Sequence, residues 1–502
     1  MARREASRGA TRAQPALIRR YAPSLGERRL VLFLADQLAL LFAFVLSGQS
    51  AVRGAELLDV ATVLGLAIVW WAAASAVDAY EIRRAAHPMR SVVSAWSAFA
   101  VALVVMILAE AIGLVAPGGI APVVSFAFMS LLFLGAGRYL YTLVLTRPEA
   151  RRRALILGAD PDVEEAARLL EREAGTEYQV VGIVSTGEVV NDRAVPILGS
   201  HVALPNLVVL HAADEVVNAS PENDIVANEA VAAVHRADPG VAVRHFSALY
   251  EQLTGRVGVR YVCPHWLALV EARTGTYLFL AVKRAMDIVL STAALVLFSP
   301  IFFLIGLAIK VDSRGPVIYR QQREGLHGRT FTMLKFRTMI VGAEAGDAIW
   351  ERHEDPRRTR VGKFLRPLHL DEVPQLLNVL AGSMSLVGPR PERSQFVAQL
   401  EKVAPVYRDR MLVRPGITGW AQVSFGYARS LEESIEKLEY DLFYVKHWSP
   451  FLDFVICLKT VNALIRRTGT EASSDSAMLT SRSESAVESE PTTSSSVSVA
   501  SS

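Results

Sequence analysis

The sequence predicts a membrane protein of three parts: an α-helical bundle, a Rossmann-like α/β domain and a mainly α-helical C-terminal domain. Two figures lead to this fold class: of the 502 residues, 51% are hydrophobic and 21% are charged. The apolar share is high for a soluble protein, whereas charges are costly inside a bilayer and would be rarer in a chain of spans alone. These figures exclude a wholly soluble enzyme, a wholly polytopic transporter and a disordered chain. The net charge of +3 does not indicate nucleic acid as a partner.

Four apolar runs near the start of the chain predict transmembrane helices. The runs are Leu30–Ser47, Val60–Val77, Val93–Val115 and Val123–Leu145. Each has about the 17–25 residues that a helix needs to cross a bilayer. We therefore predict a basic N-terminal segment over residues 1–29 and a four-helix transmembrane domain over 30–146.

The basic residues around these runs predict the orientation of the bundle. Arginines precede the first run, follow the fourth and stand between the second and third, whereas the other two loops carry only Arg53. Because Lys and Arg are enriched on the cytoplasmic side, both ends of the bundle are predicted to be cytoplasmic. Asp36, Glu110 and Arg138 lie within the runs. We interpret them as helix-pairing residues or as residues near the ends of spans.

Residues 147–280 alternate between strand and helix patterns, which is typical of a parallel, Rossmann-like sheet. We predict strands at Ala154–Leu157, Gln179–Val184, Leu207–Leu210 and Asp224–Val226, and helices at Asp162–Ala174 and Glu229–Arg236. A dinucleotide site needs G-x-G-x-x-G after the first strand, but only Gly158 is present, and Asp160 and Asp162 would repel a phosphate. We therefore favour a regulatory, docking or structural domain.

A fifth apolar run, Ile288–Ile309, has 22 residues without a charge. As a helix it would be about 33 Å long, enough to span a bilayer. However, basic residues flank both of its ends, and Ser299-Pro300 stands at its midpoint, where proline bends or breaks a helix. Membranes also tolerate kinked helices. The residues alone leave a kinked span and a re-entrant helix equally open.

The polar block between residues 315 and 425 holds an acidic pair, Asp371-Glu372, just before a predicted helix over Gln375–Leu380. Pro374 suits the first turn of such a helix. Asp371 is then either a helix-capping carboxylate, or a nucleophile or metal ligand at a helix end that also favours phosphate. Many cations surround the pair in sequence, which favours an anion-binding cleft because guanidinium groups match phosphate oxygens. They are Lys335, Arg337, Arg357, Arg360, Lys363, Arg366 and Arg390.

Four long motifs follow one another through this part of the chain. They are Lys-Phe-Arg-Thr-Met at 335–339, Leu-Asp-Glu-Val-Pro-Gln-Leu-Leu-Asn-Val-Leu at 370–380, Met-Ser-Leu-Val-Gly-Pro-Arg-Pro at 384–391 and Pro-Gly-Ile-Thr-Gly-Trp-Ala-Gln-Val at 415–423. The stretch from Lys283 to Arg467 resembles the bacterial sugar transferase family, also called monotopic phosphoglycosyl transferases or polyprenyl glycosylphosphotransferases. The preceding bundle and α/β domain are similar to the large form of this family. Pro391-Glu392-Arg393 and Gly426–Tyr444 resemble its exopolysaccharide branch, which includes exosortase-associated members.

The resemblance implies a reaction. A sugar 1-phosphate would pass from a UDP-sugar to polyprenyl (undecaprenyl) phosphate with release of UMP, as the first membrane step of exopolysaccharide or glycan biosynthesis. Asp371 would be the nucleophile that forms a covalent phosphosugar intermediate, and Glu372 would assist it. Mg²⁺ is the implied cofactor, with Asp371 and Glu372 as ligands, and Arg366, Arg390 and Lys335 would bind phosphate oxygens.

The resemblance also implies an arrangement at the membrane. The Ser299-Pro300 helix is re-entrant in the family, so a re-entrant helix over 286–309 is expected within a catalytic domain over 281–468. This domain would lie on the cytoplasmic face of the bacterial inner membrane, in contact with the lipid bilayer. The serine-rich residues 469–502 cannot bury a core and are expected to be disordered.

The main alternative is a non-catalytic polysaccharide-assembly or regulatory membrane protein with the same fold. The intact pair Asp371-Glu372 and the nearby arginines argue against it. The sequence does not identify the transferred sugar, the role and ligand of residues 147–280, or the division of metal and proton roles between the two carboxylates. A homodimer is compatible with the sequence but no motif requires one.

Overall fold

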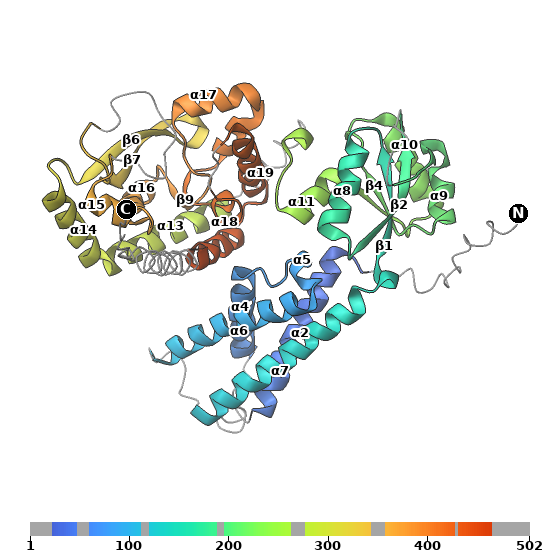
Figure 1. Ribbon diagram of the computed structural model, residues 1–502, viewed down its shortest axis with the longest axis horizontal. Coiled ribbons are helices and arrows are strands. Elements are labelled where there is room, and N and C mark those ends of the chain that lie inside the picture. The colour runs from blue at the N-terminus through green and yellow to red at the C-terminus, as the bar shows by residue number, and fades with distance from the viewer. Residues whose placement is uncertain are drawn as a thin grey trace, which may run out of the picture.

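The computed structural model describes residues 23–47, 60–111, 120–187, 195–262, 277–342, 357–426 and 430–463. It has a helical bundle, an α/β domain and a mixed, mostly helical C-terminal domain (Figure 1). The predictions for the first 22 residues and for the tail over 469–502 lie outside the described residues.

The bundle contains the four predicted helices. They are α2 (Leu25–Leu46), α4 (Val60–Ala76), α6 (Pro88–Ala111) and α7 (Ile120–Leu145), with the short α5 (Ile82–Ala85) before α6. Ser24 and Glu27 form a reciprocal capping box at the start of α2. In the described part of the bundle, three helices are long and apolar enough to cross a membrane, namely Leu25–Leu46, Pro88–Ile107 and Val123–Leu145. The fourth, α4, has 17 residues, which is at the short end of the usual range.

Two of the three charges predicted inside the bundle pair with each other. Arg138 is fully buried, and its Nη2 lies 2.6 Å from Oδ2 of Asp36, which is 2% exposed. The Tyr80 hydroxyl also donates to Asp36, at 3.0 Å. This confirms a structural, helix-pairing role for these two charges. The side chain of Glu110 lies outside the described ones.

The α/β domain has a five-stranded parallel sheet in the order β3-β2-β1-β4-β5. The strands are β1 (Arg152–Gly158), β2 (Tyr178–Ser185), β3 (Ile197–Ser200), β4 (Glu215–Asn218) and β5 (Ala242–His245). The helices are α8 (Asp162–Ala174), α9 (Leu204–Leu210), α10 (Ile225–Ala237) and α11 (Phe246–Thr254). The predicted parallel α/β class is therefore confirmed, and α8 has the predicted bounds.

Two predicted strands in this domain are wrong. Leu207–Leu210 belongs to helix α9, in which Leu204, Leu207 and Val208 are buried on one face. Spacings of three and four place residues on one side of a helix, and this pattern outweighs the strand preference of valine. Asp224 does not lie in a strand either, because its side chain accepts hydrogen bonds from Val226 and Ala227 and caps α10.

The C-terminal domain surrounds a two-stranded antiparallel sheet and a two-stranded parallel one. Its strands are β6 (Ile318–Glu324), β7 (Thr330–Phe336), β8 (Ser385–Val387) and β9 (Gly416–Thr418). Its helices are α13 (Tyr277–Leu297), α14 (Ser299–Asp312), α15 (Arg360–Leu365), η6 (Leu370–Glu372), α16 (Gln375–Ala381), α17 (Ser394–Val403), η7 (Pro405–Leu412), α18 (Trp420–Ser424) and α19 (Leu431–His447). A last helix covers 450–463 of the described residues.

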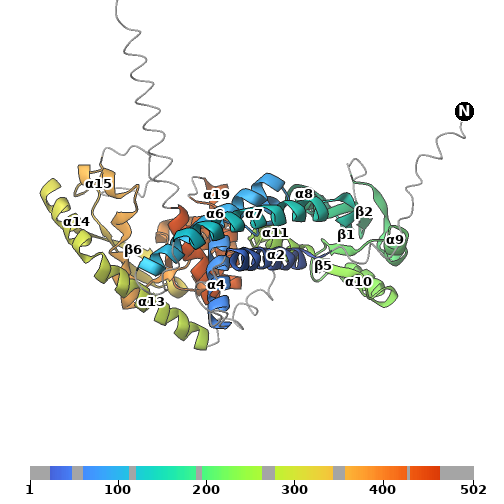
Figure 2. The ribbon, with the colours of Figure 1, turned by 90° about the horizontal axis from the view of Figure 1, so that it is seen from below.

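The fifth apolar run is broken where the sequence predicts. Helices α13 and α14 meet at a bend of 64°, and Pro300 lies in the first turn of α14 after Ser299. The pair runs along the margin of the C-terminal domain (Figure 2) and exposes large apolar side chains, among them Val296, Leu297 and Phe303. A bend of this kind fits a broken span or a re-entrant helix.

Both ends of this bent pair contact the same domain. On α13, Lys283 lies 2.5 Å from Asp453, and Asp287 accepts hydrogen bonds from Ser385 Oγ and the Leu386 amide, each at 3.0 Å. On α14, Ile305 and Ile309 pack against Phe336 and Leu365 from β7 and α15. The two ends are therefore held against one body of the protein.

Candidate active site

The acidic pair lies in a tight turn between α15 and α16. His369 has φ of 53° and starts the short helix η6, which contains Asp371 and Glu372. Pro374 then precedes the first residue of α16. Neither helix has a side-chain hydrogen bond at its N-cap, so the helix-capping interpretation of Asp371 is wrong. Asp371 and Glu372 are nevertheless 7% and 8% exposed, which is low for carboxylates.

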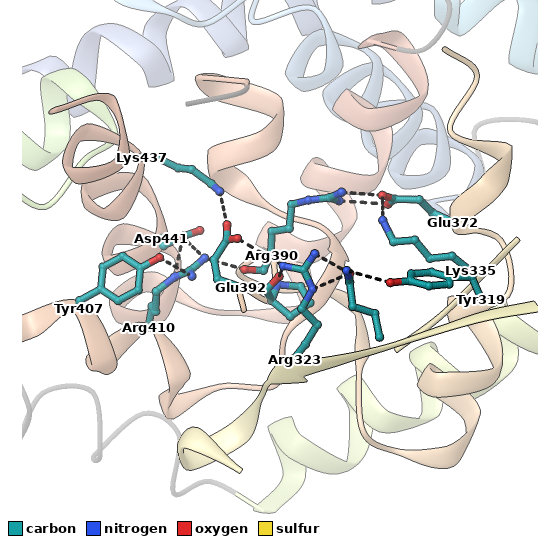
Figure 3. A network of polar contacts seen from close by, with 12 residues as sticks. Tyr319, Arg323, Lys335, Glu372, Arg390, Glu392, Tyr407, Arg410, Lys437 and Asp441 are labelled. Atoms are coloured by element: carbon teal, nitrogen blue, oxygen red, sulfur yellow. Dashed lines mark hydrogen bonds and ion pairs between the residues drawn. The ribbon is translucent and has the colours of Figure 1, made fainter. Parts of the chain in front are cut away.

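Glu372 is neutralised by two cations from distant parts of the chain (Figure 3). The Arg390 guanidinium donates to both of its oxygens, at 2.6 and 3.0 Å, and the Lys335 ammonium donates to Oε1 at 2.9 Å. Burial favours protonation of Glu372, but the two cations outweigh it and hold its pKa well below the ordinary value. Glu372 is therefore a carboxylate at neutral pH whose oxygens are both engaged.

Asp371 has a different environment although it is the adjacent residue. Within the described ranges, its carboxylate makes no hydrogen bond and has no ion-pair partner within 4.0 Å. Burial raises the pKa of Asp371, and the charge of Lys335 counteracts this increase only in part. The pair thus consists of one carboxylate held by cations and one left available for a ligand or for chemistry.

The three predicted phosphate-binding residues all act on this pair. Lys335 comes from β7, Arg366 directly follows α15, and Arg390 follows β8. The charges of all three lower the pKa of Asp371. Burial lowers the pKa of Lys335, and Glu372 counteracts this effect. Arg366 donates from Nε to Thr338 Oγ1 at 2.9 Å, which orients its guanidinium group.

The sequence predicts more cations around the acidic pair than the structure places beside it. Arg337 is 5% exposed and donates to the carbonyl oxygens of Ser313 and Arg314, so it ties the end of β7 to the end of α14. Arg360 and Lys363 are exposed on α15. These three are therefore structural or surface residues.

A second layer of charges supports the loop that carries Arg390, and the sequence predicted none of it. Arg410 and Asp441 form a buried pair at 2.6 Å, each side chain 3% exposed. Arg410 also donates from Nη2 to the Arg390 carbonyl oxygen at 2.8 Å, and Lys437 lies 2.9 Å from Glu392 (Figure 3). One signal was available: Asp441 lies between Leu438, Leu442 and Val445 on the apolar face of its helix, where a charge needs a buried partner.

A small pocket adjoins this loop. It is lined by Arg390, Glu392 and Arg410 together with Gly325, Pro389 and Pro415. Arg390 therefore has one side towards the acidic pair and another towards the pocket. The combination of an available carboxylate and nearby cations suits a negatively charged substrate such as a phosphate ester.

The expected Mg²⁺ fits Asp371 better than Glu372. Among the described residues, no group of three or more His, Cys, Asp or Glu side chains is placed to hold a metal ion. Glu372 already accepts hydrogen bonds from Arg390 and Lys335 on its two oxygens, and these cations would repel a divalent ion. Magnesium usually binds through one or two carboxylates plus substrate phosphates. Asp371 with phosphate oxygens is therefore the donor set that fits.

Comparison with known proteins identifies similar chains. The family model described as bacterial sugar transferase matches residues 278–467. An Aeromonas hydrophila UDP-N-acetylgalactosamine-undecaprenyl-phosphate N-acetylgalactosaminephosphotransferase is 41% identical over 229 residues, which are 46% of this chain and 53% of that protein. An Escherichia coli UDP-glucose:undecaprenyl-phosphate glucose-1-phosphate transferase is 45% identical over 181 residues, which are 36% of this chain and 39% of that protein.

A shorter relative is matched over most of its length. The exopolysaccharide production protein ExoY of Rhizobium meliloti is 38% identical over 205 residues, which are 37% of this chain and 87% of that protein. By contrast, the chain matches only about half or less of the Aeromonas and Escherichia relatives. The region that the family model matches coincides with the C-terminal domain that carries the acidic pair, and it leaves out the bundle and the α/β domain.

Proposed function

Because this chain belongs to the bacterial sugar transferase family, we propose that it transfers a sugar 1-phosphate from a UDP-sugar to undecaprenyl phosphate and releases UMP. The observation that carries this proposal is the contrast within the acidic pair. Asp371 has no cation partner among the described residues, whereas Glu372 is held by Arg390 and Lys335. A nucleophile such as Asp371 needs a carboxylate that is free to attack the substrate. A carboxylate that orients other groups, such as Glu372, needs fixed partners.

In the proposed first step, an Asp371 oxygen attacks the phosphorus that carries the sugar. The bond from this phosphorus to the oxygen shared with UMP breaks, so UMP leaves with the electron pair. Asp371 then carries a covalent phosphosugar. In the second step, a phosphate oxygen of the polyprenyl phosphate attacks the same phosphorus and releases the Asp371 carboxylate. The lipid product is a polyprenyl diphosphate sugar, and each step breaks one P–O bond and forms another.

The surrounding cations suit the negative charge that this reaction brings into the site. In this proposal Arg366, Arg390 and Lys335 bind phosphate oxygens, and the support is that their charges lower the pKa of Asp371. Glu372 holds Arg390 and Lys335 in position. When bound, Mg²⁺ would neutralise diphosphate charge beside Asp371.

We further propose that α13 and α14 form a re-entrant helix and that the C-terminal domain lies on the cytoplasmic face of the inner membrane. The support is that Lys283 and Asp287 at one end, and Ile305 and Ile309 at the other, contact the same domain. A spanning helix would place its two ends on opposite sides of the bilayer. A re-entrant anchor would hold the site at the depth of the polyprenyl phosphate headgroup.

Two relatives are named for different sugars, glucose and N-acetylgalactosamine. The test is therefore UMP release by the purified full chain with a panel of UDP-sugars that includes both, in the presence of undecaprenyl phosphate and Mg²⁺. We expect release with one sugar and a fall of about 10³-fold or more in Asp371→Asn, because removing a nucleophile removes the covalent route. Asp238→Asn, in the half-buried turn after α10 of the α/β domain, keeps the oxygen that accepts from the Gly240 amide; it is the control and should keep full activity.

The outcomes separate the competing functions. Equal UMP release by wild type and Asp371→Asn would refute the nucleophile assignment. An absence of release with every sugar would favour a non-catalytic assembly or regulatory protein. Without the lipid acceptor, wild type should release UMP in a single burst of about one equivalent, because the phosphosugar then stays on Asp371.

A further inference from the structure

Helix α19 has charged residues on two faces that contact different parts of the protein. One face is turned to the α/β domain and carries Glu436, Glu439 and Lys446, and the other is turned to the loop around Arg390 and carries Lys437 and Asp441. Residues three or four apart share a helix face, whereas adjacent residues do not. In Figure 1, α19 accordingly lies between α11 and the rest of the C-terminal domain.

The first face binds the segment that ends the α/β domain. Glu439 accepts hydrogen bonds from the Tyr250 hydroxyl at 3.0 Å and the Val259 amide at 3.2 Å, and its carbonyl oxygen accepts from the Val257 amide at 3.0 Å. Arg256 donates to Glu436 at 2.5 Å. One residue of α19 thus anchors three points of the neighbouring domain.

The same contact is continuous with the core of the C-terminal domain. Val257 is 2% exposed and is buried in one apolar cluster with Leu438 and Leu442 of α19. Nearby, the Trp420 indole donates to the Gly255 carbonyl oxygen at 2.8 Å. Gly255 has φ of 67°, and a Cβ there would lie 3.2 Å from the Trp420 ring, so glycine permits this close approach. The two domains therefore meet through a packed interface.

The second face holds the active-site loop at Arg390 and at Glu392. Asp441 fixes Arg410, which donates to the Arg390 carbonyl oxygen at 2.8 Å. Lys437 lies 2.9 Å from Glu392, two residues further along the loop. A movement of α19 would therefore move the backbone that aims Arg390 at Glu372.

We propose that the α/β domain is a positioning partner of the active site, which acts by docking residues 250–259 onto α19. Glu439 is the positioning residue at the centre of this contact. It does not touch the acidic pair; it acts through α19, Arg410 and the loop that carries Arg390. This inference rests on the proposed transferase function and assigns to the α/β domain a role that needs no nucleotide.

The kinetic consequence follows from the role of Arg390. Several cations can bind the phosphates of the substrate, so substrate binding does not depend on Arg390 alone. The geometry of the reacting groups, however, depends on Arg390 and Glu372 together. Small displacements of catalytic groups can reduce rates by about 100-fold. Loss of docking should therefore lower kcat by about 10- to 100-fold and change the KM for the UDP-sugar by less than about twofold.

The experiment compares Glu439→Ala, Glu439→Gln and Glu432→Ala in the full chain. At position 439, glutamine keeps one acceptor oxygen and should retain more activity than alanine. Glu432 is exposed in the first turn of the same helix, so Glu432→Ala is the control and should behave as wild type. Kinetics of UMP release are combined with amide hydrogen exchange. Exchange at 257–259 reports docking. Exchange at 388–392 reports the Arg390 loop through the amides of Gly388, Arg390 and Glu392, because Pro389 and Pro391 have no amide proton.

The proposal predicts that Glu439→Ala speeds exchange at both 257–259 and 388–392 and lowers kcat at constant KM. Faster exchange at 257–259 with unchanged kcat and unchanged exchange at 388–392 would overturn it. If Glu439→Ala does not fold, Tyr250→Phe removes a single hydrogen bond and is judged by the same criteria. If wild type releases no UMP, the transferase proposal fails, while the exchange data still test the coupling between the two domains.

Discussion

At the scale of single residues, two adjacent carboxylates have opposite pKa shifts because they have different partners. Burial acts on both, but Glu372 has Arg390 and Lys335 in direct contact and keeps a low pKa, whereas Asp371 has no such contact among the described residues and its pKa is raised. Environments that separate the pKa values of neighbouring groups commonly mark a division of roles. The motif places the two residues side by side, and the contacts decide which one is available to react.

Glu392 offers a test of the supporting charges. Burial opposes its ionisation, but Lys437 and Arg410 lower its pKa to about 2 from the ordinary 4.5. Because the folded pKa is depressed, the stabilisation is fully present above pH 4.5 and is lost as the pH falls towards 2. The shift corresponds to about 3 kcal/mol at neutral pH. Glu392→Gln should therefore lower the unfolding midpoint at pH 7, and the deficit should shrink between pH 4.5 and 2.

The measurement is the unfolding midpoint of the full chain in detergent across this pH range. Glu229→Gln, exposed on α10, is the matched control and should follow wild type at every pH. A deficit of Glu392→Gln that stays constant from pH 7 to pH 2 would contradict the assigned shift.

At the scale of elements, one side chain fixes the acidic pair relative to Lys335. Asn378 on α16 accepts from the Leu334 amide at 2.9 Å and donates to the Thr332 carbonyl oxygen at 2.8 Å. It thereby joins α16 to β7, the strand that carries Lys335. Beside it, Val379, Met333 and Met384 pack in one buried cluster. The short elements of this domain are held by such cross-links, because none of them is long enough to be stable alone.

The bent pair α13 and α14 gives a prediction about topology. If it is re-entrant, single cysteines introduced before and after it lie on the same side of the membrane. Val202→Cys (77% exposed in the α/β domain) and Thr330→Cys at the exposed start of β7 serve as the two positions, in a chain with Cys263 and Cys457 replaced by serine. Both should react with an impermeant maleimide only after the cells are permeabilised. Labelling of Thr330→Cys alone in intact cells would show that the pair spans the membrane.

At the scale of the whole molecule, one turn joins the bundle to the C-terminal domain. Asp78 lies 2.5 Å from Lys459, and the Ala76 carbonyl oxygen accepts from Asn462 at 3.0 Å. The same turn contains Tyr80 and Ala79, which contact the buried pair of Asp36 and Arg138. The core of the bundle is therefore connected directly to the last helix, over 450–463, of the domain that carries the active site.

A double-mutant cycle tests this connection. Asp78 has φ of 57°, a conformation that asparagine tolerates, so Asp78→Asn removes the charge and keeps the backbone. We expect Asp78→Asn and Lys459→Gln each to lower the unfolding midpoint slightly, with a coupling of up to about 1 kcal/mol because the pair is partly exposed. Because Asp78 also lies 3.9 Å from Arg84, the double variant should lose less stability than the sum of the two single losses. Strictly additive losses would show that the two side chains do not interact in solution.

The sequence by itself determined what depends on local pattern. Apolar run length located the bundle helices, Ser299-Pro300 marked the break between α13 and α14, and helical periodicity placed α8 at Asp162–Ala174. It failed for the short strands β3, β4 and β5, because four residues carry too little periodicity to separate a strand from a helix. The motifs around Asp371 and Arg390 identified the region of the site for the same local reason.

Tertiary structure alone decided which charges meet. Lys335 and Arg390 reach Glu372 from 37 and 18 residues away along the chain, Arg337 is directed instead to the end of α14, and Asp441 is joined to Arg410. Sequence spacing determines backbone conformation over a few residues, but the partner of a buried charge depends on how distant elements pack. The different environments of Asp371 and Glu372, and the contacts from the α/β domain through α19 to Arg390, follow from that packing.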